Sequence, residues 1–321
     1  MCFPIYTKLA KCGGVSCRYP VYSASKYCKD SEGRLVQFAI DSPDMGRLIE
    51  IHHRTEFTYS RPAGGGVMIL RQTPLSGPQQ QVQSWDTQIV GGVRQLEQKD
   101  QFGNHVQLVA ISPGSHEIRV ESFGTVGTLS ATPDKVADQG SLPLWIYCRP
   151  TRQTEAGRAV KSIVAGFDLE QLNCRQGLQR LSQQVLQRIP YTHNLTHAGT
   201  TAEDAARTKA GVCQDHAHVF IAICRMHKLP VRYVGGYLLT TDRTQHEAGH
   251  AWVEVHLKGA GWVGFDISNG VKPDDRYVRT AVGRDYADAA PITGVRRGPG
   301  IEQLEVDVRI RQVFAGTEPA G

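Results

Sequence analysis

Apolar and polar positions alternate along much of the chain between residues 48 and 129, which predicts β-strands there. Runs rich in Gly and Pro, such as 74–78 and Gly91-Gly92, separate the alternating segments and predict turns. Short strands separated by such turns are typical of an antiparallel β-sandwich or a small barrel. The predicted strands cover residues 49–59, 67–72, 82–90, 105–111 and 118–123.

The apolar period becomes helical after a stretch that contains Pro133, Pro143 and Pro150. Strand patterns then return, and a hairpin signal at 258–261 joins the last two of them. This half of the chain therefore predicts a domain of helices and strands. Its predicted helices cover 154–167, 172–189, a short segment from the capping box at 200–203 to near Gly211, and 212–229; its predicted strands cover 231–239, 250–257 and 262–267.

The patterns predict an α+β protein with two domains behind a separate N-terminal stretch. Residues 1–44 show no sustained period and the strand pattern starts directly after Met45, so we expect a non-native or disordered extension. A small cysteine module is the alternative, although its cysteines form no CxxC pair; they are Cys2, Cys12, Cys17 and Cys28. The expected parts are this extension (1–44), a β-sandwich domain (45–135), a linker (136–153), a core (154–275) and a C-terminal segment with one late strand (276–321).

Composition and charge narrow the classes of function. The chain has 321 residues, of which 40% are apolar and 21% charged, values typical of globular proteins. The net charge is +5, and the sequence contains no block of like charges, so we expect no nucleic-acid partner. The apolar stretch 231–239 is interrupted by Arg232 and is shorter than the roughly 18 residues of a membrane span. Residues 2–10 offer no apolar core of a secretory signal, so we expect a cytoplasmic protein without a membrane partner.

Three residues form a candidate catalytic group. Cys213 follows Gly211 at the predicted start of a helix, where free amide N–H groups and the helix dipole stabilise a thiolate. His250 starts one strand and Asp266 ends the next. A hairpin centred near Gly259 places these two roughly opposite each other, within a slip of one or two residues or a bulge. A carboxylate orients such an imidazole and stabilises its cation, which can hold a thiolate.

The neighbouring candidates have plainer interpretations. Cys224 is expected in the core, and His216 and His218 in packing or support of the site. His246 and His250 have HxxxH spacing, but that spacing suits zinc best on a helix and this segment is strand-like. No calcium loop is present, and we therefore expect no metal and no cofactor. Trp252 and Trp262 are expected as cleft walls or core, and Asp215 and Glu254 as supporting or solvent-facing residues.

At these motifs the chain resembles the bacterial branch of the transglutaminase-like superfamily, and the likeness covers about residues 47–312 but none of 1–44. Two departures from the family pattern are His216, where Phe is common, and Ile267-Ser268, where Pro-Thr is usual. The core motifs are 211–218, 229–237, 250–254 and 261–266; the segments 51–59, 70–74 and 100–104 are similar to the N-terminal β-domain of the branch, and 283–288 to a motif after its core.

The resemblance implies a papain-like core in which Cys213 attacks an amide carbonyl, His250 transfers the proton and Asp266 orients His250. The family includes transglutaminases, cysteine peptidases and deglycosylating amidases. We expect an enzyme that acts on a protein or peptide amide through a thioester at Cys213, released by water or by an amine co-substrate. Hydrolysis is favoured because the sequence shows no recognisable binding site for an amine co-substrate. The alternative is a catalytically silent binding or scaffold protein that keeps the papain-like core.

Overall fold

The computed structural model describes residues 46–129, 140–240 and 249–314 in full, and the backbone of Met45. It also gives the backbone of five short strands: β1 (Thr7–Cys12), β2 (Val15–Pro20), β3 (Tyr27–Lys29), β4 (Leu35–Gln37) and β12 (Gln245–His246). The chain divides into a unit of residues Met1–Pro43 and a unit of residues Asp44–Gly321. In the first unit β1 pairs with β2 and β3 pairs with β4, both antiparallel. The predicted extension, with its four cysteine side chains, lies outside the residues described in full.

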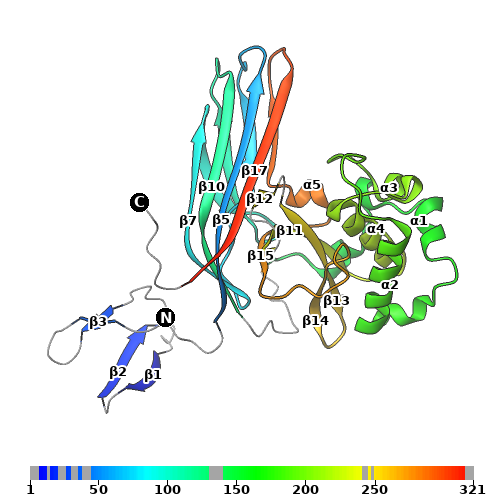
Figure 1. Ribbon diagram of the computed structural model, residues 1–321, viewed down its shortest axis with the longest axis horizontal. Helices are drawn as coiled ribbons and strands as arrows, with labels where there is room; N and C mark the ends of the chain where they lie inside the picture. The colour runs from blue at the N-terminus through cyan, green and yellow to red at the C-terminus, as the bar shows by residue number, and fades with distance from the viewer. Residues whose placement is uncertain are drawn as a thin grey trace. The chain divides into compact units, whose positions relative to one another are not determined.

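Two antiparallel sheets form the β-domain of the second unit (Figure 1). Their apolar faces share one core cluster, which includes Ile118 and Val120 from the first sheet and Met68 and Val109 from the second. The first sheet has the order β12-β17-β5-β10-β7, with β17 (Glu302–Val313), β5 (Met45–Tyr59), β10 (Glu117–Leu129) and β7 (Gln80–Val90). The second has the order β16-β6-β9-β8, with β16 (Ile292–Arg296), β6 (Gly66–Leu70), β9 (His105–Ile111) and β8 (Gly92–Lys99).

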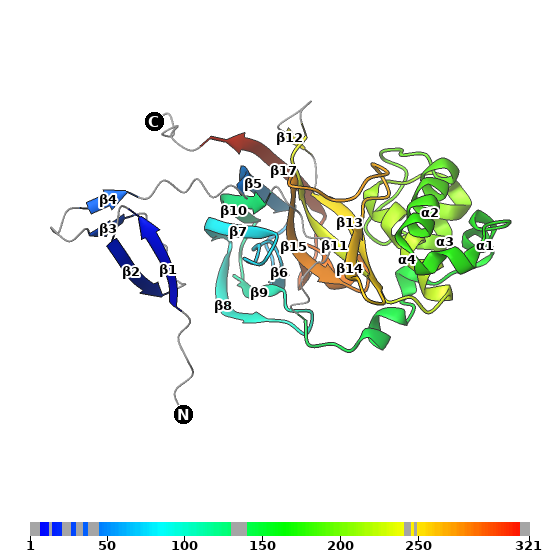
Figure 2. The same cartoon turned by 90° about the horizontal axis from the view of Figure 1, so that it is seen from below.

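The second domain, called the core domain below, packs helices on one face of an antiparallel sheet. This sheet lies between the β-domain and helices α1–α4 (Figure 2). Its order is β14-β13-β11-β15, with β14 (Gly261–Phe265), β13 (His250–Leu257), β11 (Val231–Leu238) and β15 (Tyr277–Gly283). The helices are α1 (Arg158–Ile163), α2 (Arg175–Arg188), α3 (Ala202–Thr208), α4 (Cys213–Met226) and α5 (Tyr286–Ala289), with 3-10 turns η1 (Leu144–Cys148), η2 (Arg152–Thr154) and η3 (Leu169–Asn173).

The apolar stripe read from the sequence explains how the helices pack. Leu178, Leu181 and Val185 of α2 are fully buried and lie in the same cluster as Phe220 of α4. Their spacing of three and four residues keeps them on one helical face. The sheet-rich first domain and the helix-containing second domain agree with the predicted α+β class. Among the described residues, no helix is both long and apolar enough to cross a bilayer.

The C-terminal part of the chain differs from the sequence prediction. The pattern indicated one late strand at 304–310, whereas the structure has β15, β16 and β17. β15 is buried along most of its length, so it lacks the apolar–polar alternation that marks a strand with one wet face. β16 and β17 join the two sheets of the β-domain, which is therefore built from both ends of the unit. The edge strand β8, exposed and rich in polar residues, was also missed.

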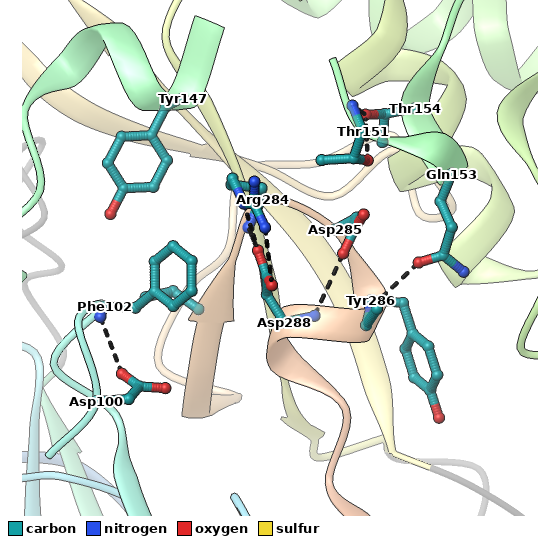
Figure 3. Close-up of polar contacts among 12 residues, drawn as sticks. Asp100, Phe102, Tyr147, Thr151, Gln153, Thr154, Arg284, Asp285, Tyr286 and Asp288 are labelled. Atoms are coloured by element: carbon teal, nitrogen blue, oxygen red, sulfur yellow. Dashed lines mark hydrogen bonds and ion pairs between the residues drawn. The ribbon is translucent and has the colours of Figure 1, made fainter. Parts of the chain in front are cut away.

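The Arg225 side chain ties the end of α4 to four other segments. Its guanidinium donates to the Tyr147 carbonyl at 3.0 Å, the Thr154 hydroxyl at 2.6 Å, the Val231 carbonyl at 3.2 Å and the Arg284 carbonyl at 2.6 Å. One of these four segments is the 283–288 motif, which begins at the last residue of β15 and is bound by Arg225 through the Arg284 carbonyl. In it Arg284 pairs with Asp288 at 2.7 Å, and the Asp285 carboxylate caps α5 by accepting from the Asp288 N–H (Figure 3).

A buried polar network joins the β-domain to the core domain. The ring of His53 on β5 is within 2.9 Å of the Tyr237 hydroxyl on β11. Gln72 lies 3.3 Å from the same ring and accepts from the Ser122 hydroxyl at 2.9 Å. Burial lowers the pKa of His53 to about 4, helped by His52 and opposed by Asp307. The ring is therefore neutral at pH 7.

This neutral ring makes stability depend on pH. His53 takes up a proton below about pH 6.5 in the unfolded chain but only near pH 4 in the folded one. Its contribution is complete above pH 6.5 and is lost as the pH falls towards 4, by about 3 kcal/mol in total. We expect urea unfolding at pH 7 and pH 4.5 to show a smaller loss for His53→Gln than for the wild type. The exposed His116→Gln should match the wild type, and equal losses in all three would contradict the expectation.

Candidate active site

Helix α4 begins at Cys213 because Asp215 closes its first turn. The Asp215 carboxylate accepts from the Val212 N–H at 2.9 Å and from the Thr196 hydroxyl at 2.7 Å. A Cβ at Gly211 would lie 2.6 Å from the Asp215 Cβ, so a side chain there would displace the cap. Cys213 is partly buried, at the helix end whose amide N–H groups have no acceptor within the helix. The backbone thus places a sulfur where negative charge is stabilised.

The β13–β14 hairpin brings His250 to Asp266. The two strands pair Val253 with Phe265 and Leu257 with Gly261, so the register is centred on Gly259, as the sequence predicted. Asp266 therefore lies across from residue 252 rather than 250. The contact is diagonal, two residues out of direct register, and His250 Nε2 meets Asp266 Oδ2 at 2.6 Å.

The Asp266 carboxylate is fully buried and surrounded by donors. Its Oδ2 accepts from His250, from the Asn269 side-chain amide at 2.7 Å and from the Tyr277 hydroxyl at 2.7 Å, while Oδ1 accepts from the Asn269 N–H at 3.1 Å. Burial raises the pKa of Asp266, but the hydrogen bonds and the charge of His250 outweigh burial and lower it below the usual value. Asp266 is therefore ionised at neutral pH.

The His250 ring is poised as a cation. Burial lowers its pKa, but hydrogen bonds to Asp266 and to the Cys213 side chain, together with their charges, raise it to about 10. With Nε2 bonded to Asp266, the other ring nitrogen is left for the sulfur. Trp252 stacks on the ring with centroids 6.3 Å apart and planes at 25°, and the His250 side chain is 15% exposed. The structure thus brings all three predicted residues together.

The two departures from the family pattern contact each other. His216 Nδ1 lies 2.8 Å from the Ser268 hydroxyl, and His216 Nε2 lies 2.8 Å from the Ile189 carbonyl. The pair links the first turn of α4 to the turn that follows Asp266. Burial lowers the pKa of His216, which fits a neutral ring that supports the site. The polar Ser268 thus gives the buried His216 a partner that Phe would not need.

The remaining predicted residues support the structure. His218 is buried and accepts from the Tyr286 N–H at 3.1 Å. Trp252 and Trp262 are core residues, 3% and 2% exposed. Glu254 forms a buried ion pair with Arg232 at 2.7 Å. Cys224 is buried, which raises the pKa of its thiol and keeps it unreactive.

The geometry of the described residues also bears on a metal site and on further contacts of Cys213, His250 and Asp266. No three His, Cys, Asp or Glu side chains lie close enough to hold a metal ion in the part of the chain that the structure describes, and the His246 side chain falls outside that part. Tyr277, which contacts Asp266, was not identified from the sequence. It lies on β15, a strand that shows no alternation, and no motif spacing points to it.

Comparisons with known proteins agree with this architecture. Residues 161–267 match the transglutaminase-like superfamily, and residues 49–127 match the bacterial transglutaminase-like N-terminal region. An uncharacterised protein of Mycobacterium leprae is 26% identical over 282 residues, which cover 83% of this chain and 99% of the relative. An uncharacterised protein of Mycobacterium tuberculosis is 25% identical over 270 residues, covering 76% and 86%.

A solved structure shows the same fold. The crystal structure of a candidate cysteine protease from Cytophaga hutchinsonii superposes with a TM-score of 0.65 at 20% identity, covering 86% of this chain and 94% of that one. The likeness therefore extends over both domains of the second unit. The two matched regions correspond to the β-domain and the core domain described above. The chain belongs to the transglutaminase-like superfamily and carries the bacterial transglutaminase-like N-terminal region.

Proposed function

We propose that the chain is a cysteine enzyme that acts on amides of proteins or peptides, with Cys213 as nucleophile, His250 as acid and base, and Asp266 as the residue that orients His250. The observation that carries the proposal is the 2.6 Å contact of His250 Nε2 with Asp266, on a ring whose pKa the neighbouring Cys213 side chain also raises. A cation in that position holds a thiolate, which is the reactive form of cysteine.

The proposed reaction has two stages. Cys213 Sγ attacks the amide carbon, the C–N bond breaks, and His250 gives its proton to the leaving amine, which leaves a thioester on Cys213. Water or an amine then attacks the thioester while His250 accepts the proton. The C–S bond breaks, and a carboxylic acid or a new amide is released with the cysteine restored.

The developing oxyanion needs hydrogen-bond donors. The backbone N–H of Cys213 is the natural one, because the first N–H groups of α4 have no acceptor within the helix. This role also explains why the nucleophile opens a helix rather than a strand. A single such donor is typically worth a factor of about 10² to 10³ in kcat.

The proposal extends to the arrangement of the two domains, the outcome of the reaction and the location of the protein. We propose that α4 packed on the core sheet is the papain-like arrangement and that the two sheets of the β-domain form a β-sandwich; the shared apolar cluster supports the latter. Hydrolysis is the preferred outcome, because water is always present. The substrate is a protein or peptide, an amine is the alternative acceptor, and the proposed location is the cytoplasm.

The test is a substrate screen of the full chain. Purified protein is incubated with glutamine-containing peptides and a peptide library, with and without a primary-amine probe. Mass spectrometry then follows three products: cleaved peptide, deamidated glutamine and amine adduct. We expect products that depend on Cys213, with hydrolysis dominant. A Cys213-dependent amine adduct as the main product would replace hydrolysis by acyl transfer. No difference between wild type and Cys213→Ala on any substrate would favour a silent scaffold and end the proposal.

A further inference from the structure

The Asp266 carboxylate has a donor that comes from outside the hairpin. The hydroxyl of Tyr277, the first residue of β15, donates to Oδ2 at 2.7 Å, the same oxygen that His250 contacts. Its ring also packs edge-on against Trp252, with centroids 5.4 Å apart, and lies 6.0 Å from the His250 ring. Tyr277 is 7% exposed, and burial raises the pKa of its phenol, so the hydroxyl keeps its proton and can only donate to the carboxylate.

The β-domain holds β15 on the side that no strand of the core sheet covers. β15 is the edge of that sheet, and two side-chain amides of the β-domain pair with its backbone. Gln80 accepts from the Arg279 N–H and donates to the Arg279 carbonyl, both at 2.9 Å. Asn104 accepts from the Val282 N–H and donates to the Val282 carbonyl, both at 2.7 Å. Each amide thus replaces one residue of a neighbouring strand.

Contacts to the β-domain lie on both sides of Tyr277 along the chain. Two residues before it, the Asp275 carbonyl accepts from the Thr128 hydroxyl at 2.6 Å, and the Asp275 carboxylate accepts from Arg47 at 3.1 Å. Two residues after it, Arg279 is held by Gln80. The β-domain therefore holds the backbone on both sides of Tyr277, while the Tyr277 hydroxyl contacts Asp266.

We propose that Tyr277 is a positioning residue that fixes the Asp266 carboxylate against His250, and that the β-domain keeps Tyr277 in place through Gln80 and its neighbours. The inference rests on the proposed function of Cys213, His250 and Asp266. It assigns the β-domain a part in the geometry of the active site. A carboxylate that loses this donor keeps only the His250 and Asn269 donors, so its Oδ2 is held less firmly against His250.

The first test uses Tyr277→Phe, which removes only the hydroxyl. We expect kcat to fall about tenfold while KM stays within about twofold, because the lost hydrogen bond is to the charged Asp266, which is proposed to orient His250 and not to bind substrate. The matched control is Tyr237→Phe. Tyr237 is a buried tyrosine on the adjacent strand β11, and its hydroxyl contacts His53 instead of Asp266. It loses the same atom and should keep the wild-type kcat, measured well below the unfolding temperature of each variant.

A second readout does not depend on turnover. The His250 Nε2 proton, in a 2.6 Å contact with a carboxylate, should give a downfield proton resonance that Asp266→Asn removes. In Tyr277→Phe this resonance should move upfield and broaden, and in Tyr237→Phe it should stay in place. An unchanged kcat, or a resonance that stays in place or moves downfield, would overturn the proposal for Tyr277. If the wild type proves to have no turnover, the proposed function fails, and the resonance alone decides the role of Tyr277.

The part assigned to the β-domain is tested with Gln80→Leu. We expect the same upfield movement and a several-fold loss of kcat, because β15 loses one of its side-chain partners next to Tyr277. Gln81→Leu makes the same substitution at the adjacent, exposed position and should behave like the wild type. If Gln80→Leu folds, shown by an unchanged circular dichroism spectrum, and keeps both kcat and the resonance, the β-domain does not position Tyr277.

Discussion

The Cys213→Ala variant should lose amide-directed activity by a factor of about 10⁴ or more, since removal of an attacking group leaves only binding and oxyanion stabilisation. Its fold should persist, because Cys213 is only partly buried at the first turn of α4 and the Asp215 cap does not involve its sulfur. The measurement is kcat/KM on the best substrate of the screen. A decrease of less than tenfold in a pure preparation would exclude Cys213 as the nucleophile.

Alkylation by iodoacetamide gives an independent measure, provided that it is read at one residue. Cys174 is exposed and will also react, so total labelling is not informative. Cleavage after Lys209 and Arg225 releases one peptide, 210–225, that carries both Cys213 and the buried Cys224. Fragment masses from this peptide separate the two thiols. We expect labelling of Cys213 at neutral pH and none of Cys224, which serves as the internal control.

Asp266→Asn should lower kcat/KM by about 10³ at pH 7, because the amide neither carries the charge nor enforces the ring orientation that the carboxylate supplies. The wild-type His250 keeps its proton up to a pKa of about 10. Without the carboxylate that pKa should fall, because only Cys213 then remains to raise it against burial. The basic limb of the pH profile of kcat/KM should therefore move to lower pH.

The control for this variant is Asp274→Asn in the same loop. Asp274 pairs with Arg276 at 2.8 Å, its side chain is 43% exposed, and it makes no contact with the triad among the contacts described. It should keep both the rate and the position of the basic limb. If Asp266→Asn kept the wild-type basic limb while losing activity, the high pKa of His250 would have a source other than Asp266.

Much of the core domain follows from local sequence signals. Gly211 and the Asp215 cap define where α4 begins, and the predicted start at residue 212 differs from the observed one by a single residue. The turn at Gly259, with φ of 82°, centres the hairpin, so counting outward brought His250 and Asp266 within two residues of each other. Such signals act over a few residues and can be read from one sequence.

The rest depends on pairings between distant segments, which one sequence does not specify. Tyr277 reaches Asp266 only because β15 returns beside β11, and nothing in the sequence around residue 277 selects that neighbour. The His216–Ser268 contact joins a helix to a turn that is far away along the chain. For the same reason the contacts of the Gln80 and Asn104 side chains with the backbone of β15 could not be predicted, since each side chain finds its partner across the boundary between the domains.

The place of β17 has a consequence for biosynthesis. This strand pairs with β5 along its whole length, from Glu302 opposite Tyr59 to Val313 opposite Leu48. At about 5 to 20 residues per second, the ribosome needs roughly 10 to 50 seconds to make the chain between them. Throughout that interval one edge of β5 stays open to wrong partners. A nascent chain that stopped before β16 would leave the edges of both β5 and β6 bare, so incomplete products should be the most aggregation-prone forms of this protein.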